Sequence, residues 1–471
     1  MNTATTQAFD TTIAKAVAAE RDPFGSHRQP AAHRLATAFG GTLLASGLLF
    51  GAATAHADAV TDWNAILETT VIEATPDPFL RVRSSTIMQV AVFEAVNAII
   101  GGYQPYLGTL TAPHGASPEA AAIAAAHRTL VTLHPDRATD LDARRVASLA
   151  QVRGGQAKTD GIAVGEAAAL AMVTKRASDG SDTETPYTPR TEPGEYRPTP
   201  PDFTPAFRPG LGNVAPFGIR YGAQFRLGPP PALGSGKYAR DYNEVKRVGD
   251  VNSAESERPK DRTDVARYFE VADAELYYSA ARQVSQAQGK TLAENARIFA
   301  LLGIAIFDAT VAVFDSKYFY NYWRPVTAIK AGDKDGNRKT DVDANWLSLV
   351  FTPPFPSYPS GHAGFGGAAR RVLEHMFGTH GHAITLADPR IPDVVLHYTS
   401  WKQIIDDVDD ARIFGGVHYR FDQEDAARQG RQVGRFILRH LLRPVHKHGH
   451  EQAALASAVG EASDEPKEDE E

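Results

Sequence analysis

Three short stretches of this chain combine histidine, serine and cationic residues at spacings that suit an oxyanion site. In the first, Pro359-Ser360-Gly361-His362, the proline holds the chain extended, and the residues that follow predict a helix ending near Gly378. Unpaired N–H groups and the positive end of the dipole favour an anion at such a helix N-terminus, and Gly361 lets the anion approach the backbone. The alternative interpretation is an N-cap serine beside a turn histidine.

The second stretch is an aromatic-rich run, residues 315–325, that carries two cations, Lys317 and Arg324. A helix whose start is marked by the capping box Thr291-Leu292-Ala293-Glu294 leads into it. Because proline disfavours helix at the residue before it, Pro325 predicts that this element stops at Arg324. The two cations either stack on the aromatic rings or are surface residues whose stems pack on them.

The third stretch holds Arg412, His418 and Asp422. A carboxylate four residues after a histidine can accept a proton from one imidazole nitrogen and so fix the tautomer of the other. As an isolated pair, the same spacing also fits a contact on a helix surface.

Together, the three stretches supply cations, neutral donors and bases that match one task, holding a tetrahedral or trigonal-bipyramidal oxyanion between two histidines. No HExxH, Walker or CxxC motif competes with them. Six other histidines are expected to be solvated side chains, not ligands: His375, His380, His382, His446, His448 and His450.

The order and spacing of these residues resemble the three-part signature shared by vanadium-dependent haloperoxidases and the type 2 phosphatidic acid phosphatase superfamily. Six residues separate Lys317 from Arg324-Pro325, five separate Arg412 from His418, and three separate His418 from Asp422. The resemblance covers roughly residues 307–442. One position departs from the pattern, because the family usually has serine where this chain has Ala411.

The resemblance implies a vanadate cofactor, with His418 as the ligand of its metal, and a site that phosphate would also fit. It implies that His362 is the acid-base residue and that Asp422 orients His418. It further implies a catalytic role for Lys317 beside its binding role. The residues implied to bind the oxyanion are Lys317, Arg324, Ser360, Gly361, Arg412 and His418.

Two activities share such a pocket, so fold analogy alone does not choose between them. The expected function is a haloperoxidase that oxidises halide with hydrogen peroxide to a hypohalous acid equivalent. The alternative is an exported acid phosphatase with His418 as the phosphoryl-accepting nucleophile. A binding protein that only sequesters the anion is disfavoured, since paired histidines suit acid-base chemistry. The halide, a small organic acceptor and the oligomeric state, a homo-oligomer included, stay open.

The composition of the chain excludes several other classes of function. The chain has 471 residues, 43% of them hydrophobic, and a formal charge of -7, which provides no basic field for nucleic acid. Because it contains no cysteine, disulfides, thiolate nucleophiles and cysteine-ligated metals are excluded.

Helical periodicity on both sides of a Pro/Gly-rich segment predicts an all-α fold of two packed helical bundles joined by a long loop. The expected parts are an N-terminal bundle at residues 58–178, an ordered loop at 179–236, a C-terminal bundle with the oxyanion site at 237–445, and an acidic disordered tail at 446–471.

Residues 1–57 resemble a secretory signal, with basic residues, an apolar stretch and a small-residue end at Ala55-His56-Ala57. The chain is therefore expected to be exported, periplasmic or extracellular, with no membrane span after cleavage. An uncleaved membrane anchor is the alternative.

Overall fold

The structure is a computed structural model that describes residues 58–108 and 110–445. The predicted signal at residues 1–57 and the predicted tail at 446–471 lie outside the described residues. The described chain is mostly helical, which confirms the all-α class. The described part also contains a two-stranded antiparallel sheet, β1 (His380–Ala387) and β2 (Val395–Ser400), that the sequence analysis did not predict.

The sequence did not predict this hairpin because only a few of its residues alternate between apolar and polar. In β1 the buried positions are every second residue, His382, Ile384 and Leu386. The prediction that His382 is a solvated side chain was wrong. It is buried beside Trp401, and its Nε2 lies 3.1 Å from the Gly378 carbonyl oxygen. His375 and His380 are exposed, as expected. The predictions for His446, His448 and His450 fall outside the described residues.

The helices of the N-terminal half begin where local capping signals stand. Asp58 forms a capping box, and Asp77 and Ser117 cap helices whose first residue is proline. The elements are α2 (Ala59–Leu67), the π-helix η1 (Glu68–Ile72), α3 (Pro78–Ile100), α4 (Pro118–Leu133), the 3-10 turn η2 (Pro135–Arg137), α5 (Ala138–Ala150) and α6 (Gln156–Arg176).

Small residues bring α4 and α6 into backbone contact. A Cβ added at Gly165 would lie 2.3 Å from the Ala121 carbonyl oxygen, and one at Gly161 would lie 2.3 Å from that of Ser117. The two helix backbones are therefore packed without room for a larger side chain at these positions.

Residues 179–235 are irregular except for two short 3-10 turns, η3 (Leu211–Asn213) and η4 (Gly222–Phe225). One buried carboxylate fixes part of this segment to the core. Asp308 accepts the backbone N–H groups of residues 217, 218 and 219 at 2.7, 2.7 and 2.8 Å. Because these amides have a partner, the segment can run against the core without unpaired backbone donors at this point.

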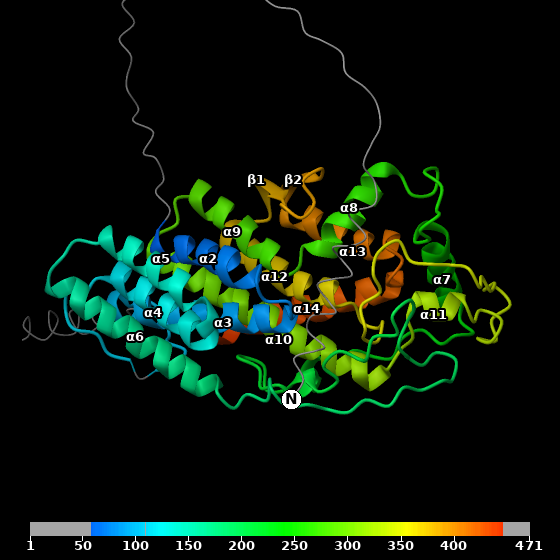
Figure 1. Cartoon of the computed structure of the whole chain (residues 1–471), viewed down its shortest axis with the longest axis horizontal. Helices are drawn as coiled ribbons and strands as arrows, with labels where there is room; N and C mark the ends of the chain where they lie inside the picture. The colour runs from blue at the N-terminus through cyan, green and yellow to red at the C-terminus, as the bar shows by residue number, and fades with distance from the viewer. Residues whose placement is uncertain (1–57, 109, 446–471) are drawn as a thin grey trace, which may run out of the picture. The chain divides into compact units, whose positions relative to one another are not determined.

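The C-terminal half is built around one long helix, α10 (Leu292–Tyr320), which packs against α3 and against two helices of its own half (Figure 1). The predicted capping box of Thr291 and Glu294 is present at its start. The other helices of this half are α7 (Gly236–Val248), α8 (Lys260–Val271), α9 (Glu275–Ala287), α11 (Pro325–Ile329), α12 (Gly361–Phe377), α13 (Trp401–Phe414) and α14 (Arg420–His440).

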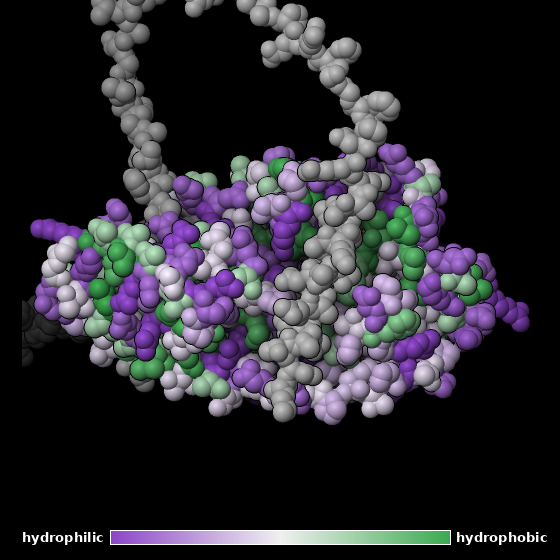
Figure 2. Space-filling view, in the orientation of Figure 1, coloured by the Kyte–Doolittle hydropathy of each residue, from purple (hydrophilic) through white to green (hydrophobic). Residues whose placement is uncertain are grey.

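By length and composition α10 could cross a membrane, although no such segment was expected after the signal. Its apolar window is 94% buried inside the protein, which is the state of a core helix. Hydrophilic residues cover much of the face shown in Figure 2, with smaller hydrophobic groups among them.

One continuous apolar core runs from Val60 to Leu442 and includes α10. The helices of the two halves therefore share a core, and the boundaries at residues 178 and 236 stay predictions.

Candidate active site

The predicted helix N-terminus is present, because α12 begins at Gly361 with Ser360 as its N-cap. The Ser360 hydroxyl accepts the Ala363 N–H, and the Ser360 N–H donates to the Asp422 carbonyl oxygen at 3.1 Å. A Cβ built on Gly361 would meet nothing within 4 Å. Space for a ligand therefore lies beside the first turn, where the unpaired N–H groups and the dipole favour an anion.

Lys317 lies in the last turn of α10 and is fully buried. Its Nζ donates to the carbonyl oxygens of Pro356 and Ser357, each at 2.8 Å, and lies 4.9 Å from the centre of the Phe355 ring. Burial, then the charges of Arg324 and Arg412, hold the pKa of Lys317 well below its ordinary value. An anion at this place would counter both effects and favour the charged form.

Arg324 is the N-cap of α11, which corrects the predicted element boundary. The long helix ends at Tyr320 with Asn321 in the left-handed region, and Pro325 begins the next helix instead of stopping the previous one. The Arg324 side chain is fully buried, with Nε donating to the Phe355 carbonyl at 2.7 Å and Nη1 to that of Val417 at 2.8 Å. Burial lowers its pKa to about 10.

Arg412 lies in the last turn of α13 and is 2% exposed. Its Nη1 donates to the Phe269 carbonyl at 2.9 Å. Burial lowers its pKa to about 10, against the opposing charges of Glu270 and Asp273. This third cation comes from a different helix from the other two, so only the tertiary fold brings the three together.

His418 and Asp422 meet at the start of α14, with His418 Nδ1 2.7 Å from Asp422 Oδ2. A carboxylate at this distance accepts the proton of Nδ1, which leaves the Nε2 lone pair on the other side of the ring. Nε2 lies 3.1 Å from Arg324 Nη1. Burial and the three cations hold the pKa of His418 well below its ordinary value, so the imidazole is neutral. Burial raises the pKa of Asp422 to about 7.

His362 stands apart, because its side chain is 20% exposed while the cations and His418 are enclosed. It is the second residue of α12, and its Nε2 lies 3.9 Å from Asp273 Oδ1. Burial against the fold, then the charges of Arg412, Lys317 and Arg324, lower its pKa well below the ordinary value. A neutral imidazole on the open side of the cations can accept a proton.

The structure thus brings all the predicted site residues around one place. Two further residues, which the sequence analysis missed, join them. Ser357 is fully buried, and its hydroxyl donates to Asp422 Oδ2 at 2.6 Å. Asp273 lies between α8 and α9 and reaches His362. The Pro-Ser-Tyr-Pro-Ser run was a weak signal for Ser357, whereas nothing local marks Asp273.

The polar groups left without partners indicate what the site accepts. Arg324 Nη2 and Arg412 Nε are buried and donate to nothing. Such unpaired donors are costly in a protein interior, and a multiply charged oxyanion would satisfy both. No group of three His, Asp or Glu residues that could hold a metal ion occurs at residues 58–108 or 110–445. The residues present therefore fit an oxyanion such as vanadate, and the neutral His418 Nε2 is a nitrogen that could ligate its central atom.

Comparisons with known proteins agree with this chemistry. The VCPO second helical-bundle domain matches residues 297–447, which contain every predicted site residue. The vanadium chloroperoxidase of Curvularia inaequalis is 29% identical over 176 residues. Over these residues the chain resembles the vanadium-dependent haloperoxidase family. That alignment covers 28% of this chain and 28% of the curated relative, so it spans little more than a quarter of either protein.

Solved structures of haloperoxidases share the fold over a much larger part of the chain. A bacterial vanadium-dependent iodoperoxidase superposes with a TM-score of 0.70 at 24% identity, covering 82% of this chain and 97% of the other. An apo-type bacterial vanadium-dependent chloroperoxidase superposes with a TM-score of 0.61 at 17% identity, covering 77% and 94%. The N-terminal half of this chain is therefore part of the haloperoxidase fold as well.

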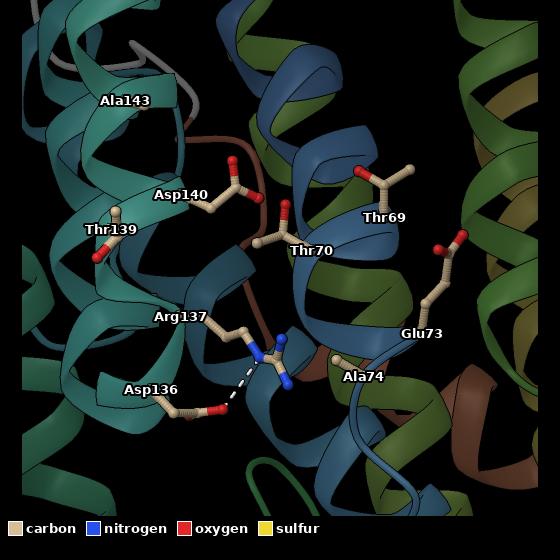
Figure 3. Close-up of a pocket in the computed structure, with 9 residues that line it drawn as sticks. All are labelled: Thr69, Thr70, Glu73, Ala74, Asp136, Arg137, Thr139, Asp140 and Ala143. Carbon is tan, nitrogen blue, oxygen red and sulfur yellow. Dashed lines mark ion pairs between the residues drawn. The ribbon is translucent and has the colours of Figure 1, made fainter.

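A separate hollow on the surface does not belong to this site (Figure 3). It lies between η1 and the start of α5, where Arg137 and Asp136 pair at 3.0 Å. None of the predicted site residues lines it.

Proposed function

We propose that this chain is an active vanadate-dependent haloperoxidase that oxidises halide with hydrogen peroxide to a hypohalous acid equivalent. The observation that carries the proposal is the neutral His418, whose Nε2 lies 3.1 Å from Nη1 of the buried Arg324 while Nδ1 is held by Asp422. A bound metal needs a neutral nitrogen lone pair, and its oxyanion ligands need charged donors.

His418 Nε2 would hold the metal of vanadate. The side chains of Lys317, Arg324 and Arg412, with the N-terminal end of α12, would bind its oxygens. When bound, vanadate supplies a Lewis-acidic centre that activates peroxide without a change in oxidation state. The enclosed position of the cations excludes water and so strengthens their attraction for negative charge.

His362 is proposed to move protons on the open side of the site. Its Nε2 would accept a proton from incoming peroxide and return one to the leaving oxygen. Asp273 Oδ1, 3.9 Å away, would stabilise the imidazolium that forms between these two transfers.

Lys317 is proposed to act on peroxide as well as to bind the anion. Its pKa is held low, and an arriving anion raises it, so Nζ is charged when the site is filled. A charged Nζ beside the reacting oxygens withdraws electron density from them and favours attack by halide.

Phosphatase activity is the outcome that would replace this proposal, because phosphate fits the same donors and a neutral His418 could attack phosphorus. The test begins with purified protein free of vanadate, assayed for hydrolysis of an aryl phosphate. Orthovanadate is then added, and peroxide-dependent halogenation of a dye is measured. Halide oxidation that depends on vanadate is expected. Rapid ester hydrolysis that vanadate inhibits, without halide oxidation at any pH, would assign the chain to the phosphatase branch.

Two pairs of variants sharpen this test. His418→Ala should abolish both vanadate binding and halogenation, whereas His440→Ala, at an exposed histidine in the last turn of α14, should do neither. His362→Ala should lower turnover but leave vanadate bound, since it serves proton transfer. His375→Ala, exposed on the same helix as His362, is its control.

We also propose that the chain is exported and cleaved after Ala57. The N-cap of α2, Asp58, directly follows that bond, so cleavage there would leave the first described helix intact. Mass spectrometry of the native protein from periplasm and medium should find a chain that begins at Asp58. A cell-associated chain that retains residues 1–57 would support the membrane-anchor alternative.

A further inference from the structure

The sulfur and indole side chains of this protein, which an oxidant attacks readily, are nearly all enclosed. The chain has no cysteine, four methionines and four tryptophans. The four tryptophans are at most 1% exposed, and Met88 and Met172 are fully buried. Met376 is half-buried at the edge of the core. Within residues 58–108 and 110–445, it is therefore the one thioether that solvent reaches.

Met376 lies in the last turn of α12, beside a buried cation. Its sulfur accepts a hydrogen bond from Arg297 Nη1 at 3.6 Å. Arg297 belongs to the N-terminal part of α10 and is 8% exposed. Its Nε donates to the Leu442 carbonyl at 2.7 Å, and its guanidinium carbon lies 4.9 Å from the centre of the Tyr103 ring. Arg297 therefore joins α10 and α12 to the residues that follow α14.

The contacts of Arg297 leave its charge weakly compensated. Burial lowers its pKa, and the group that opposes this effect is Tyr103, not a carboxylate. A thioether sulfur is a weak acceptor, whereas a sulfoxide is polar and usually disrupts the core around it. At Met376 a charged donor already points at the sulfur, so an added oxygen would accept a charge-assisted hydrogen bond.

We propose that Met376 is an oxidation site, where hypohalous acid converts the thioether to a sulfoxide that Arg297 then holds. In this step the sulfur loses two electrons and forms a bond to oxygen. The oxygen–halogen bond breaks, the halogen leaves as halide, and the proton passes to water. The inference rests on the proposed haloperoxidase function for the source of the oxidant. Because the product strengthens a contact, the protein can consume stray oxidant without losing stability.

The position of the site is tested with reagent hypobromous acid, added at one equivalent to protein free of vanadate and peroxide. Peptide mass spectrometry then follows the gain of one oxygen atom. The Met376 peptide should gain oxygen about tenfold or more faster than the Met88 and Met172 peptides, since buried sites react only through local opening. The variant Met376→Leu should lose this fastest reaction and keep the others. Equal rates at the three methionines would overturn the inference.

The role of Arg297 is tested through the thermal midpoint before and after the same treatment. Oxidised wild type should keep or raise its midpoint. In Arg297→Leu the sulfoxide has no charged donor, so oxidation should lower the midpoint by about 2 °C or more, the effect of one unsatisfied polar group. The matched control is Arg443→Leu, at an exposed arginine next to Leu442. It should respond as wild type does. A fall in oxidised wild type, or none in Arg297→Leu, would overturn the inference.

A further pair of variants needs no oxidant and decides the question if Arg297→Leu does not fold. In Met376→Gln the amide oxygen takes the place of the sulfoxide oxygen and can accept from Arg297. Its midpoint should equal or exceed that of Met376→Leu. A midpoint lower by about 2 °C or more would show that Arg297 does not hold a polar group there. Since these tests supply the oxidant or omit it, a wild type that oxidises no halide would contradict the proposed function alone.

Discussion

His418 and Asp422 are four residues apart and bonded at 2.7 Å between Nδ1 and Oδ2, so that His418 Nε2 points to Arg324. Both residues are enclosed, with exposures of 2% and 0%. The Asp422 oxygen that holds His418 also accepts the Ser357 hydroxyl at 2.6 Å and the Tyr419 N–H at 3.2 Å. The imidazole is therefore fixed in one tautomer before any ligand binds, which is the condition for a single, predetermined ligating atom.

Asp422→Asn should weaken orthovanadate binding about 10- to 100-fold, the usual effect of removing the group that orients a metal-bound histidine. An amide can donate as well as accept, so it no longer dictates which nitrogen of His418 carries the proton. The dissociation constant is measured by calorimetry. Glu424→Gln, at an exposed carboxylate two residues away that pairs with Lys237, is the control. Unchanged affinity in Asp422→Asn would show that Asp422 does not set the tautomer.

Arg324→Lys should lower the affinity for orthovanadate and for phosphate by about tenfold or more, since a charged hydrogen bond contributes about 1.5–3 kcal/mol. Lysine cannot donate to the carbonyls of Phe355 and Val417 and also offer the free Nη2 donor. Calorimetric titration with each anion separately measures both affinities. Arg226→Lys is the matched control, because Arg226 also stacks on a phenylalanine, Phe319, and pairs with Asp315, but away from the site residues.

Gly430→Ala should destabilise the protein by about 3 kcal/mol or more, as overpacking at a rigid contact does. A Cβ at residue 430 would lie 1.8 Å from the Gly364 carbonyl oxygen, where α14 packs on the first turn of α12. The strain would therefore reach the helix end that carries Ser360 and His362, and anion affinity should fall with the thermal midpoint. Gly228→Ala, where a Cβ meets nothing within 4 Å, should change neither quantity.

Asp241→Asn tests a buried carboxylate through its pH dependence. Asp241 is 6% exposed, accepts the Phe421 N–H at 3.1 Å, and has a pKa that burial raises to about 6. Since the folded pKa lies above the unfolded value, the folded state holds the extra proton between them. This contribution to stability is present below about pH 4 and is lost as the pH rises through 6.

Relative to wild type, Asp241→Asn should therefore gain about 1 kcal/mol of unfolding free energy between pH 5 and pH 8, because the neutral amide avoids this loss. Urea denaturation at the two pH values measures it. The control is Asp202→Asn, at an exposed carboxylate in the irregular segment. If Asp241→Asn instead loses unfolding free energy relative to wild type between pH 5 and pH 8, burial does not raise the pKa of Asp241.

The local features of the site could be read from the sequence because their causes are local. The helix start at Gly361 follows from an N-cap serine after a proline, and the helix start after Thr291 from a capping box. The neighbourhood of His418 and Asp422 follows from their four-residue spacing at a helix start. Boundaries were less certain, since Pro325 is compatible both with ending one helix and with beginning the next, and the structure has it beginning α11.

Only the tertiary structure decided which of these pieces face one another. Lys317, Arg324 and Arg412 come from three helices, and their enclosure depends on carbonyl groups of residues 269, 355, 356, 357 and 417 that no side-chain pattern reveals. Ser357 likewise acquires its role by contact with a partner that is distant in sequence. Residue types and spacing determine which chemistry the chain can carry, whereas the burial of the cations and their unpaired donors depend on packing between segments far apart in the sequence.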